Sequence, residues 1–353
     1  MDRPSDRSPV DEVEAGRAQS AFCKRSVAVP RGFLREGNPR TMLDAACRRM
    51  QAGEEAVLAL VLDTEGSTYA GAGDMVLFAN DTQVGWLSGG CLEQDLATRA
   101  ERVDAMGRIE WVEIDTRGDE DLLSGSALGC RGRLRIALLP LRAMPGIAEL
   151  FAAWLRGGVE LQRELRTTGE ILFRVGDRVA HWRLPALRDA SLPVSGSWSL
   201  PLGRLPRALV LGAGPETPTL VPMLRALGWW VGVAERRARW DQAAQGADAR
   251  FLAGSVRAIA EADCDVALVM HHDFELDREA LDALACSDIG LVGLLGPRRR
   301  RDDLFRLLTP QQRERLVPRL RSPVGMDIGG RGPEAIALSI AAELQHWRAT
   351  VAA

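Results

Sequence analysis

The chain has 353 residues, of which 46% are hydrophobic and 26% are charged, and its formal net charge is −3. This length suits about two domains, each large enough to bury its own core. The near-neutral charge argues against a nucleic-acid surface, and no apolar run is long enough to span a bilayer. The six cysteines are scattered and form no CxxC pair, which argues against structural zinc and predicts a reducing, cytoplasmic location.

The first half of the chain predicts a small mixed α/β domain over residues 39–184. Residues 1–38 are polar and charged, and we expect a mobile N-terminal extension there. Apolar periodicity and turn residues predict the following elements in order: a helix over 39–50, strands over 56–62, 75–79 and 83–87, a helix from about 92 to 106, strands over 109–114 and 134–139, a helix over 147–155 and a hairpin at 176–177. Residues 185–205 are rich in Pro, Ser and Gly and predict a linker.

The second half alternates short apolar strands with helices over residues 206–353. The expected elements are strands over 208–211, 230–234, 266–270 and 289–295, and helices over 215–227, 276–285 and from 333 onward. This alternation is typical of a Rossmann-like, doubly wound parallel sheet.

One turn in the first domain combines two glycines with a thiol where a strand ends and a helix begins. Its sequence is Ser88-Gly89-Gly90-Cys91-Leu92-Glu93. Backbone amides at such a turn attract an anion and favour the thiolate form of a cysteine. The alternative is a tight turn with Cys91 as a small core residue.

A second glycine turn, Gly212-Ala213-Gly214, follows the first strand of the Rossmann-like domain. It resembles a dinucleotide-binding turn, although Thr217 replaces the third glycine. Glu235 ends the next strand, where an acidic residue would hold a ribose, and Arg236 follows it as a phosphate-binding alternative. A Rossmann-like scaffold without a nucleotide is the other interpretation.

Three further strand ends or loops in this domain carry candidate ligand-binding residues, because ligands of open α/β sheets lie beyond the carboxyl ends of the strands. His271 follows one strand. Gly296, Arg298 and Arg299 follow the next, and the alternative for these arginines is a solvated basic helix face. Asp327 and Gly329 lie in a glycine-rich loop before the last helix, where a turn or capping role is equally open.

Six motifs together resemble the XdhC/CoxI family, the accessory factors of xanthine dehydrogenase and related molybdenum hydroxylases. They are Glu65-Gly66-Ser67-Thr68, Ser88-Gly89-Gly90-Cys91-Leu92-Glu93, Asp115-Thr116-Arg117-Gly118, Leu128-Gly129-Cys130, Gly293-Leu294-Leu295-Gly296 and Gly325-Met326-Asp327-Ile328-Gly329. The resemblance runs from about residue 41 to residue 348. It implies a protein that binds molybdenum cofactor and delivers it to an apo molybdenum hydroxylase, in step with sulfuration of the metal by a partner cysteine desulfurase.

On this hypothesis the glycine turns bind the anionic groups of the cofactor, in its molybdopterin or dinucleotide form, and Cys91 and Cys130 supply sulfur. Cys91 would contact molybdenum transiently. The predicted cofactor-binding residues are Ser88, Gly89, Gly90, Cys91, Glu93, Cys130, Gly212, Gly214, Glu235, Arg236, His271, Gly296, Arg298, Arg299, Asp327 and Gly329. We expect these turns to face one cleft, and we expect a homodimer that acts as a chaperone rather than an enzyme.

Two other functions fit parts of the sequence. The first is an NAD(P)-dependent oxidoreductase, which Gly212, Gly214 and Glu235 favour and which the missing third glycine disfavours. The second is an assembly platform in which the Rossmann-like domain binds a nucleotide and docks partners. A titration with reduced nicotinamide nucleotide separates the first from a cofactor carrier.

Overall fold

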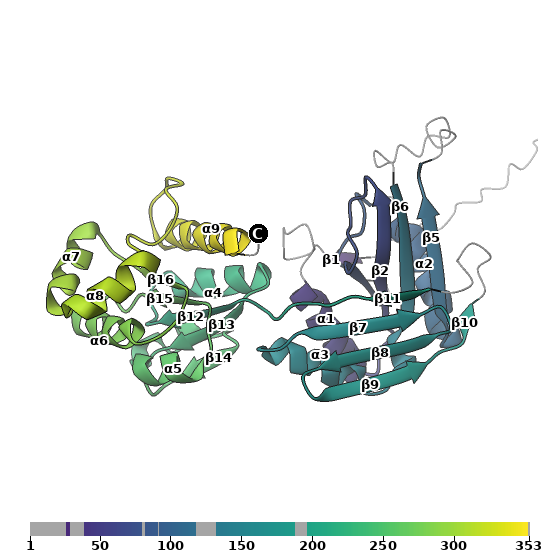
Figure 1. Ribbon diagram of the computed structural model, residues 1–353, viewed down its shortest axis with the longest axis horizontal. Helices are drawn as coiled ribbons and strands as arrows, with labels where there is room; N and C mark the ends of the chain where they lie inside the picture. Colours follow the sequence, from purple (N-terminus) through teal and green to yellow (C-terminus); the bar gives the residue numbers. More distant parts are fainter. Residues whose placement is uncertain are drawn as a thin grey trace, which may run out of the picture.

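The computed structural model describes residues 26–28, 39–79, 82–90, 92–117, 132–187 and 196–351. It has an N-terminal α/β domain and a C-terminal domain with a parallel sheet, side by side in Figure 1. Within the described residues, no helix is both long enough and apolar enough to cross a membrane.

The N-terminal domain is built on a mixed sheet with the strand order β1-β4-β3-β2-β6-β5-β10 in the described residues. The strands are β1 (Ser26–Ala28), β2 (Val57–Gly66), β3 (Met75–Ala79), β4 (Thr82–Val84), β5 (Ile109–Asp115), β6 (Gly132–Pro140) and β10 (Ala186–Leu187). The first six residues of the central strand β2, 57–62, are all apolar and buried, because both faces of the sheet are covered there. Leu58 and Leu60 face one core, and Val57 and Ala59 face the other.

Different helices cover the two faces of this sheet. Helices α1 (Pro39–Gln51) and α3 (Ile147–Arg156) pack on the face of Leu58 and Leu60, and α2 (Glu93–Met106) packs on the opposite face. The three helices predicted in this domain are therefore present, each with its apolar stripe toward the sheet.

A second, antiparallel sheet completes the domain with the order β11-β7-β8-β9. Its strands are β7 (Leu161–Arg166), β8 (Glu170–Val175), β9 (Arg178–Arg183) and β11 (Ser197–Ser199). The segment predicted as a linker, 185–205, contains β10 and β11, and its Leu200 and Leu205 are buried. Strand pairing and burial thus attach much of this Pro- and Gly-rich segment to the N-terminal domain.

The C-terminal sheet is entirely parallel, with the order β14-β13-β12-β15-β16-β17, and this confirms the predicted Rossmann-like architecture. The strands are β12 (Arg207–Leu211), β13 (Trp230–Ala234), β14 (Ala249–Phe251), β15 (Val266–Val269), β16 (Leu291–Leu294) and β17 (Leu320–Arg321). The helices are α4 (Thr217–Ala226), α5 (Ser255–Glu261), α6 (Phe274–Ala285), α7 (Arg298–Leu307), α8 (Pro310–Leu316) and α9 (Pro333–Val351). Short 3-10 turns lie at Leu141–Ala143, Ala238–Trp240, Gln242–Ala244 and Val317–Arg319. Helices α4 and α9 contribute to the core on one face of the sheet, and α5 and α6 to the core on the other.

Buried contacts join the two domains. The Arg40 guanidinium on α1 donates to the carbonyl oxygen of Trp229 at 2.6 Å and pairs with the carboxylate of Asp248. Trp230 packs into the core that α1 and α3 share with the first sheet, and the Arg207 guanidinium lies 3.9 Å from the centre of its ring. The N-terminal sheet therefore meets the Rossmann-like domain through its α1 and α3 face.

Candidate functional site

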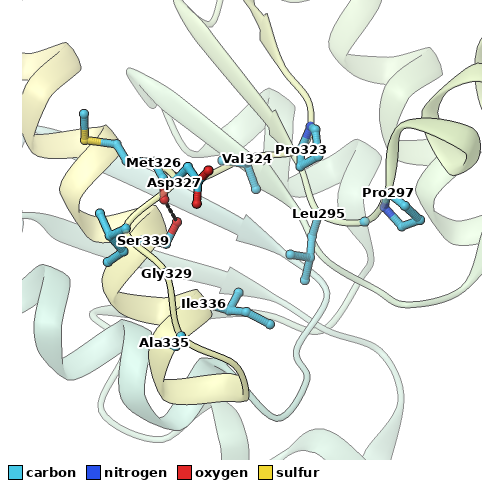
Figure 2. A pocket seen from close by; sticks show the side chains of 13 residues that line it. Leu295, Pro297, Pro323, Val324, Met326, Asp327, Gly329, Ala335, Ile336 and Ser339 are labelled. Carbon is cyan, nitrogen blue, oxygen red and sulfur yellow. Dashed lines mark hydrogen bonds between the residues drawn. The ribbon is translucent and has the colours of Figure 1, made fainter.

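A pocket of about 340 Å³ lies beyond the carboxyl end of β16, and it brings together Gly296, Asp327 and Gly329 of the predicted site. Its volume falls in the range of small-molecule sites. Its lining residues are Leu295, Gly296, Pro297, Pro323, Val324, Met326, Asp327, Ile328, Gly329, Gly330, Ala335, Ile336 and Ser339. All of them belong to the C-terminal domain, and the residues labelled in Figure 2 lie after the end of β16, in the loop between β17 and α9, and on α9 itself.

The loop over this pocket presents backbone amides that donate to no other described residue. Gly325 donates to the Glu343 carboxylate and Met326 to the carbonyl of Ser339, which fixes the start of the loop on α9. In the described part of the chain, the amides of Asp327, Ile328 and Gly329 donate no hydrogen bond, nor does the amide of Gly296. Asp327, Ile328 and Gly329 are exposed, so water can bond to their amides, and a ligand with an anionic or carbonyl oxygen can replace that water.

Apolar side chains form the remaining wall of the pocket. Leu295, Val324 and Ile336 line it, and Val324 is buried against the sheet. Glycine is required at the end of β16, because Gly296 has φ +121° and a Cβ there would lie 2.9 Å from Cδ of Arg300. The pocket thus combines polar backbone groups with an apolar surface, as sites for flat, polar organic molecules do.

The turn Gly212-Ala213-Gly214 differs from this pocket, because its amides are already used. The amide of Gly212 donates to Ala234, that of Ala213 to the Glu235 carboxylate at 2.8 Å, and that of Gly214 to the Thr217 hydroxyl at 3.0 Å. Thr217 therefore bonds to the turn from the position where the fingerprint has its third glycine. A pyrophosphate at this turn would have to displace these bonds.

Glu235, predicted to hold a ribose, is clamped by Arg237. The carboxylate accepts hydrogen bonds from the Arg237 amide, Nε and Nη2 at 2.7, 2.9 and 2.7 Å. Burial alone would raise the pKa of Glu235, but the bonds from Arg237 and from the Ala213 amide outweigh it and lower the pKa to about 2. Arg236, the predicted phosphate ligand, is exposed and forms an ion pair with Glu279.

Two histidines close the space above the same turn. Gly212 has φ +91°, and a Cβ there would lie 2.5 Å from Cα of His271. A Cβ on Gly214 would lie 2.8 Å from the His272 ring, whose Nε2 is 3.1 Å from the buried Glu216 carboxylate. The glycines here admit histidine side chains and backbone where a dinucleotide site admits phosphate.

His271 belongs to a buried hydrogen-bonded chain that sequence reasoning did not detect. Its Nε2 lies 3.1 Å from the Ser255 hydroxyl, its Nδ1 lies 3.1 Å from the Asp277 carboxylate, and Arg300 Nη2 donates to the other oxygen of Asp277 at 2.7 Å. Ser255, His271 and Asp277 are at most 5% exposed. This series of hydrogen bonds runs from His271, which lies against Gly212, to Arg300, whose Cδ would lie 2.9 Å from a Cβ on Gly296.

In the N-terminal domain, the side chains of Ser88 and Glu93 form hydrogen bonds within the Ser88–Glu93 turn. The Glu93 carboxylate accepts from the amides of Leu87 and Ser88 and from the Ser88 hydroxyl, and that hydroxyl accepts from the amides of Gly90 and Leu92 at 3.0 and 3.2 Å. Both side chains are buried, whereas Gly89 and Gly90 are exposed. The turn leads into α2, on the sheet face away from the Rossmann-like domain, and none of its residues lines the pocket beside β16.

The remaining predicted residues stand apart from this pocket. Arg298 and Arg299 are exposed at the start of α7, and the Arg299 side chain is 93% exposed. Cys91 and Cys130 lie outside the described residues. Among the residues that are described, no group of three or more His, Cys, Asp or Glu side chains has the arrangement of a metal site.

The fold and the pocket define a two-domain α/β protein with a Rossmann-like C-terminal domain. A model of the XdhC and CoxI family matches residues 49–115, and a model of the XdhC Rossmann domain matches residues 208–344. The chain belongs to the XdhC/CoxI family.

Relatives and a solved structure agree with this assignment. The chain is 28% identical to a probable xanthine dehydrogenase subunit from Bacillus subtilis over 90% of this chain and 99% of that protein. It is 31% identical to the uncharacterized protein YqeB of Escherichia coli over 40% of this chain and 27% of that protein. A crystal structure of a xanthine dehydrogenase from Bacillus halodurans is similar with a TM-score of 0.68 and 26% identity, over 87% of this chain and 96% of that one.

Proposed function

We propose that this protein binds molybdenum cofactor as its cargo and delivers it to an apo molybdenum hydroxylase of the xanthine dehydrogenase type. Family membership and the names of the relatives support an accessory role in the maturation of such an enzyme. The main support for cofactor binding is the pocket beside β16, where the amides of Gly296 and of the Asp327–Gly329 loop have no acceptor within the described residues.

The chemistry of this pocket fits a phosphorylated pterin. The loop amides suit carbonyl or phosphate oxygens, and Leu295, Val324 and Ile336 provide apolar surface for a flat ring. The carboxylate of Asp327 also lines the pocket and repels a phosphate, so a phosphate group would lie at the amides away from that side chain. Contacts made mainly by backbone amides hold a ligand without committing a buried charge to it, which suits a carrier that must release its cargo. The Ser88–Glu93 turn lies on the sheet face away from this pocket, so the sulfur contact that we assign to Cys91 and Cys130 belongs to a second site that the cofactor occupies at another stage. In this proposal, sulfuration by a cysteine desulfurase partner precedes release.

The oxidoreductase alternative is less well supported. It requires the pyrophosphate and ribose of a nicotinamide nucleotide at Gly212-Ala213-Gly214 and Glu235, and protein groups already bond to both. Titration with reduced nicotinamide nucleotide tests it directly, and binding in the micromolar range or tighter would favour this alternative over a carrier.

The proposal is tested by the molybdenum and pterin content of the full chain purified from cells that make the cofactor. We expect both components at comparable molar amounts, and transfer that activates an apo molybdenum hydroxylase. Ala335 lines the pocket in the first turn of α9, where a glutamate is compatible with the helix. Ala335→Glu should lower the bound pterin at least tenfold because it repels phosphate, and the uncharged Ala335→Gln of equal size should retain it.

A second variant addresses the N-terminal turn separately. Cys91→Ser should reduce the molybdenum content of the folded protein while thermal unfolding stays unchanged. Equal cofactor content in Ala335→Glu and Ala335→Gln would refute the pocket, and wild-type molybdenum content in Cys91→Ser would remove that thiol from the role.

A further inference from the structure

Strand β7 carries a charged side chain at a position where its alternation pattern places core residues. Leu161, Arg163 and Leu165 point inward, and the residues between them are exposed. Arg163 is 1% exposed, and its Nε donates to the carbonyl of Leu200 at 2.9 Å. Its Nη1 lies 3.2 Å from the carbonyl oxygen of Gly73 and 3.1 Å from the sulfur of Met75.

No carboxylate in the described part of the chain forms an ion pair with this guanidinium, and its Nη2 donates to none of the described residues. Burial lowers the pKa of Arg163 to about 10, and the negative charge of Asp74 counters this only in part. Arg40, which is also buried, has the carboxylate of Asp248 as a partner. Asp74 offsets the charge of Arg163 through space, but no described residue accepts a hydrogen bond from Nη2, so this buried group calls for a direct acceptor that the described residues do not supply.

A second pocket of about 340 Å³ lies at this guanidinium. It is lined by Arg163, by the turn from Gly71 to Met75, by Pro39 and by the segment from Pro201 to Gly203. Gly73 has φ +93°, and a Cβ on it would lie 3.3 Å from Arg163 Nη2, so Nη2 lies directly beside the glycine in the pocket wall. Asp74 also lines the pocket and accepts the Gly71 amide at 2.7 Å, which disfavours a ligand group with two negative charges.

We propose that Arg163 is the anion-binding group of a second small-molecule site, in the N-terminal domain, and that it takes a singly charged carboxylate or phosphate group of its ligand. The Nη2 atom offers two N–H groups to such an oxyanion. The pocket is larger than an inorganic ion requires, so the anionic group is one end of an organic molecule. This site shares no residue with the pocket beside β16, and it does not depend on cofactor delivery.

Acetate and inorganic phosphate are the probes, compared with chloride at equal ionic strength, and binding to the full chain is followed by calorimetry and thermal unfolding. We expect acetate, phosphate or both to bind and to raise the unfolding temperature above its value in chloride. Stronger binding of acetate identifies a carboxylate ligand, and stronger binding of phosphate a phosphorylated one.

The exposed Ala72 in the pocket wall allows a matched pair of variants. Ala72→Glu supplies an internal carboxylate and should weaken anion binding at least tenfold, whereas the uncharged Ala72→Gln should bind within twofold of wild type. Arg163→Met should lose the response, and Arg174→Met, an exposed position on the neighbouring strand β8, should keep it. The proposal is overturned if neither anion exceeds chloride in the wild type, if Ala72→Glu and Ala72→Gln respond equally, or if Arg163→Met binds like the wild type.

Discussion

The clamp between Glu235 and Arg237 makes a prediction that can be worked out quantitatively. Glu235 is 6% exposed and accepts four hydrogen bonds, three from Arg237 and one from the Ala213 amide. Glu235→Gln keeps the size of the side chain but removes its charge, so Arg237 is left without its counterion. We expect this variant to fold and to be measurably less stable.

The magnitude follows from the pKa of Glu235, which falls from its usual value of about 4.5 to about 2 in the folded protein. This pKa difference corresponds to about 3 kcal/mol of stability at neutral pH, and solvent screening of the partly exposed Arg237 reduces the contribution to about 2 kcal/mol. Because the pKa is lower in the folded state, the contribution is complete well above pH 4.5 and is lost as the pH falls toward 2. By pH 3.5 about 1 kcal/mol of it should be gone.

Urea unfolding of wild type and Glu235→Gln at pH 7.0 and pH 3.5 measures both quantities. The neighbouring surface pair of Arg236 and Glu279 provides the control, since Glu279→Gln should cost less than about 1 kcal/mol and show little pH dependence. A Glu235→Gln variant as stable as wild type at pH 7.0, or a stability difference that grows as the pH falls, would refute the assignment of Glu235 as a charged structural group.

Two further predictions concern buried polar groups elsewhere. Asp277→Asn leaves Arg300 without its carboxylate partner, so the free energy of unfolding should fall by about 3 kcal/mol. Urea titration measures this loss, and a loss below about 1 kcal/mol would contradict the buried ion pair. Ser88→Ala removes the hydroxyl that accepts from the Gly90 and Leu92 amides, so amide hydrogen exchange at these two positions should become about tenfold faster. Exchange in the Rossmann-like domain should be unchanged. Wild-type exchange rates at both positions would contradict the hydrogen bonds of this turn.

Periodicity and glycine positions were sufficient to predict most of the architecture. Four strands of the parallel sheet, β12, β13, β15 and β16, were predictable because they are short apolar runs separated by helical segments, and β2 was predictable because its first six residues are apolar on both faces. The short edge strands β14 and β17 were not predicted, because their sequences are too short and too polar to give a signal. Strands β10 and β11 were not, because a Pro- and Gly-rich segment carries no periodic signal and these strands form only by pairing with β5 and β7. Local composition does not encode a partner that lies far away in the sequence.

The candidate site was predictable to the extent that it follows from strand ends. Gly296, Asp327 and Gly329 come together because the end of β16 and the loop before α9 meet at one edge of the sheet. The roles of Arg237 and Asp277 were not predictable, since each depends on a side-chain bond to another element. The buried position of Arg163 can be inferred from the sequence once the register of β7 is known, because this charged residue stands at an inward position of an alternating strand.

The two glycine turns of the Rossmann-like domain explain why a ligand is expected beside β16 rather than at the first strand. At Gly212-Ala213-Gly214 every turn amide has an acceptor within the protein, Arg237 neutralises the acidic residue, and His272 packs against Gly214. At Gly296 and the Asp327–Gly329 loop the amides have no acceptor within the described residues, and a pocket adjoins them. Binding at the first turn must break hydrogen bonds within the protein, whereas binding at the exposed second loop displaces only water from the amides, so the cost of binding an oxyanion is lower at the second. The two turns of this Rossmann-like domain therefore differ in how many of their amides the protein itself uses, and this difference is the reason for proposing the site at the end of β16.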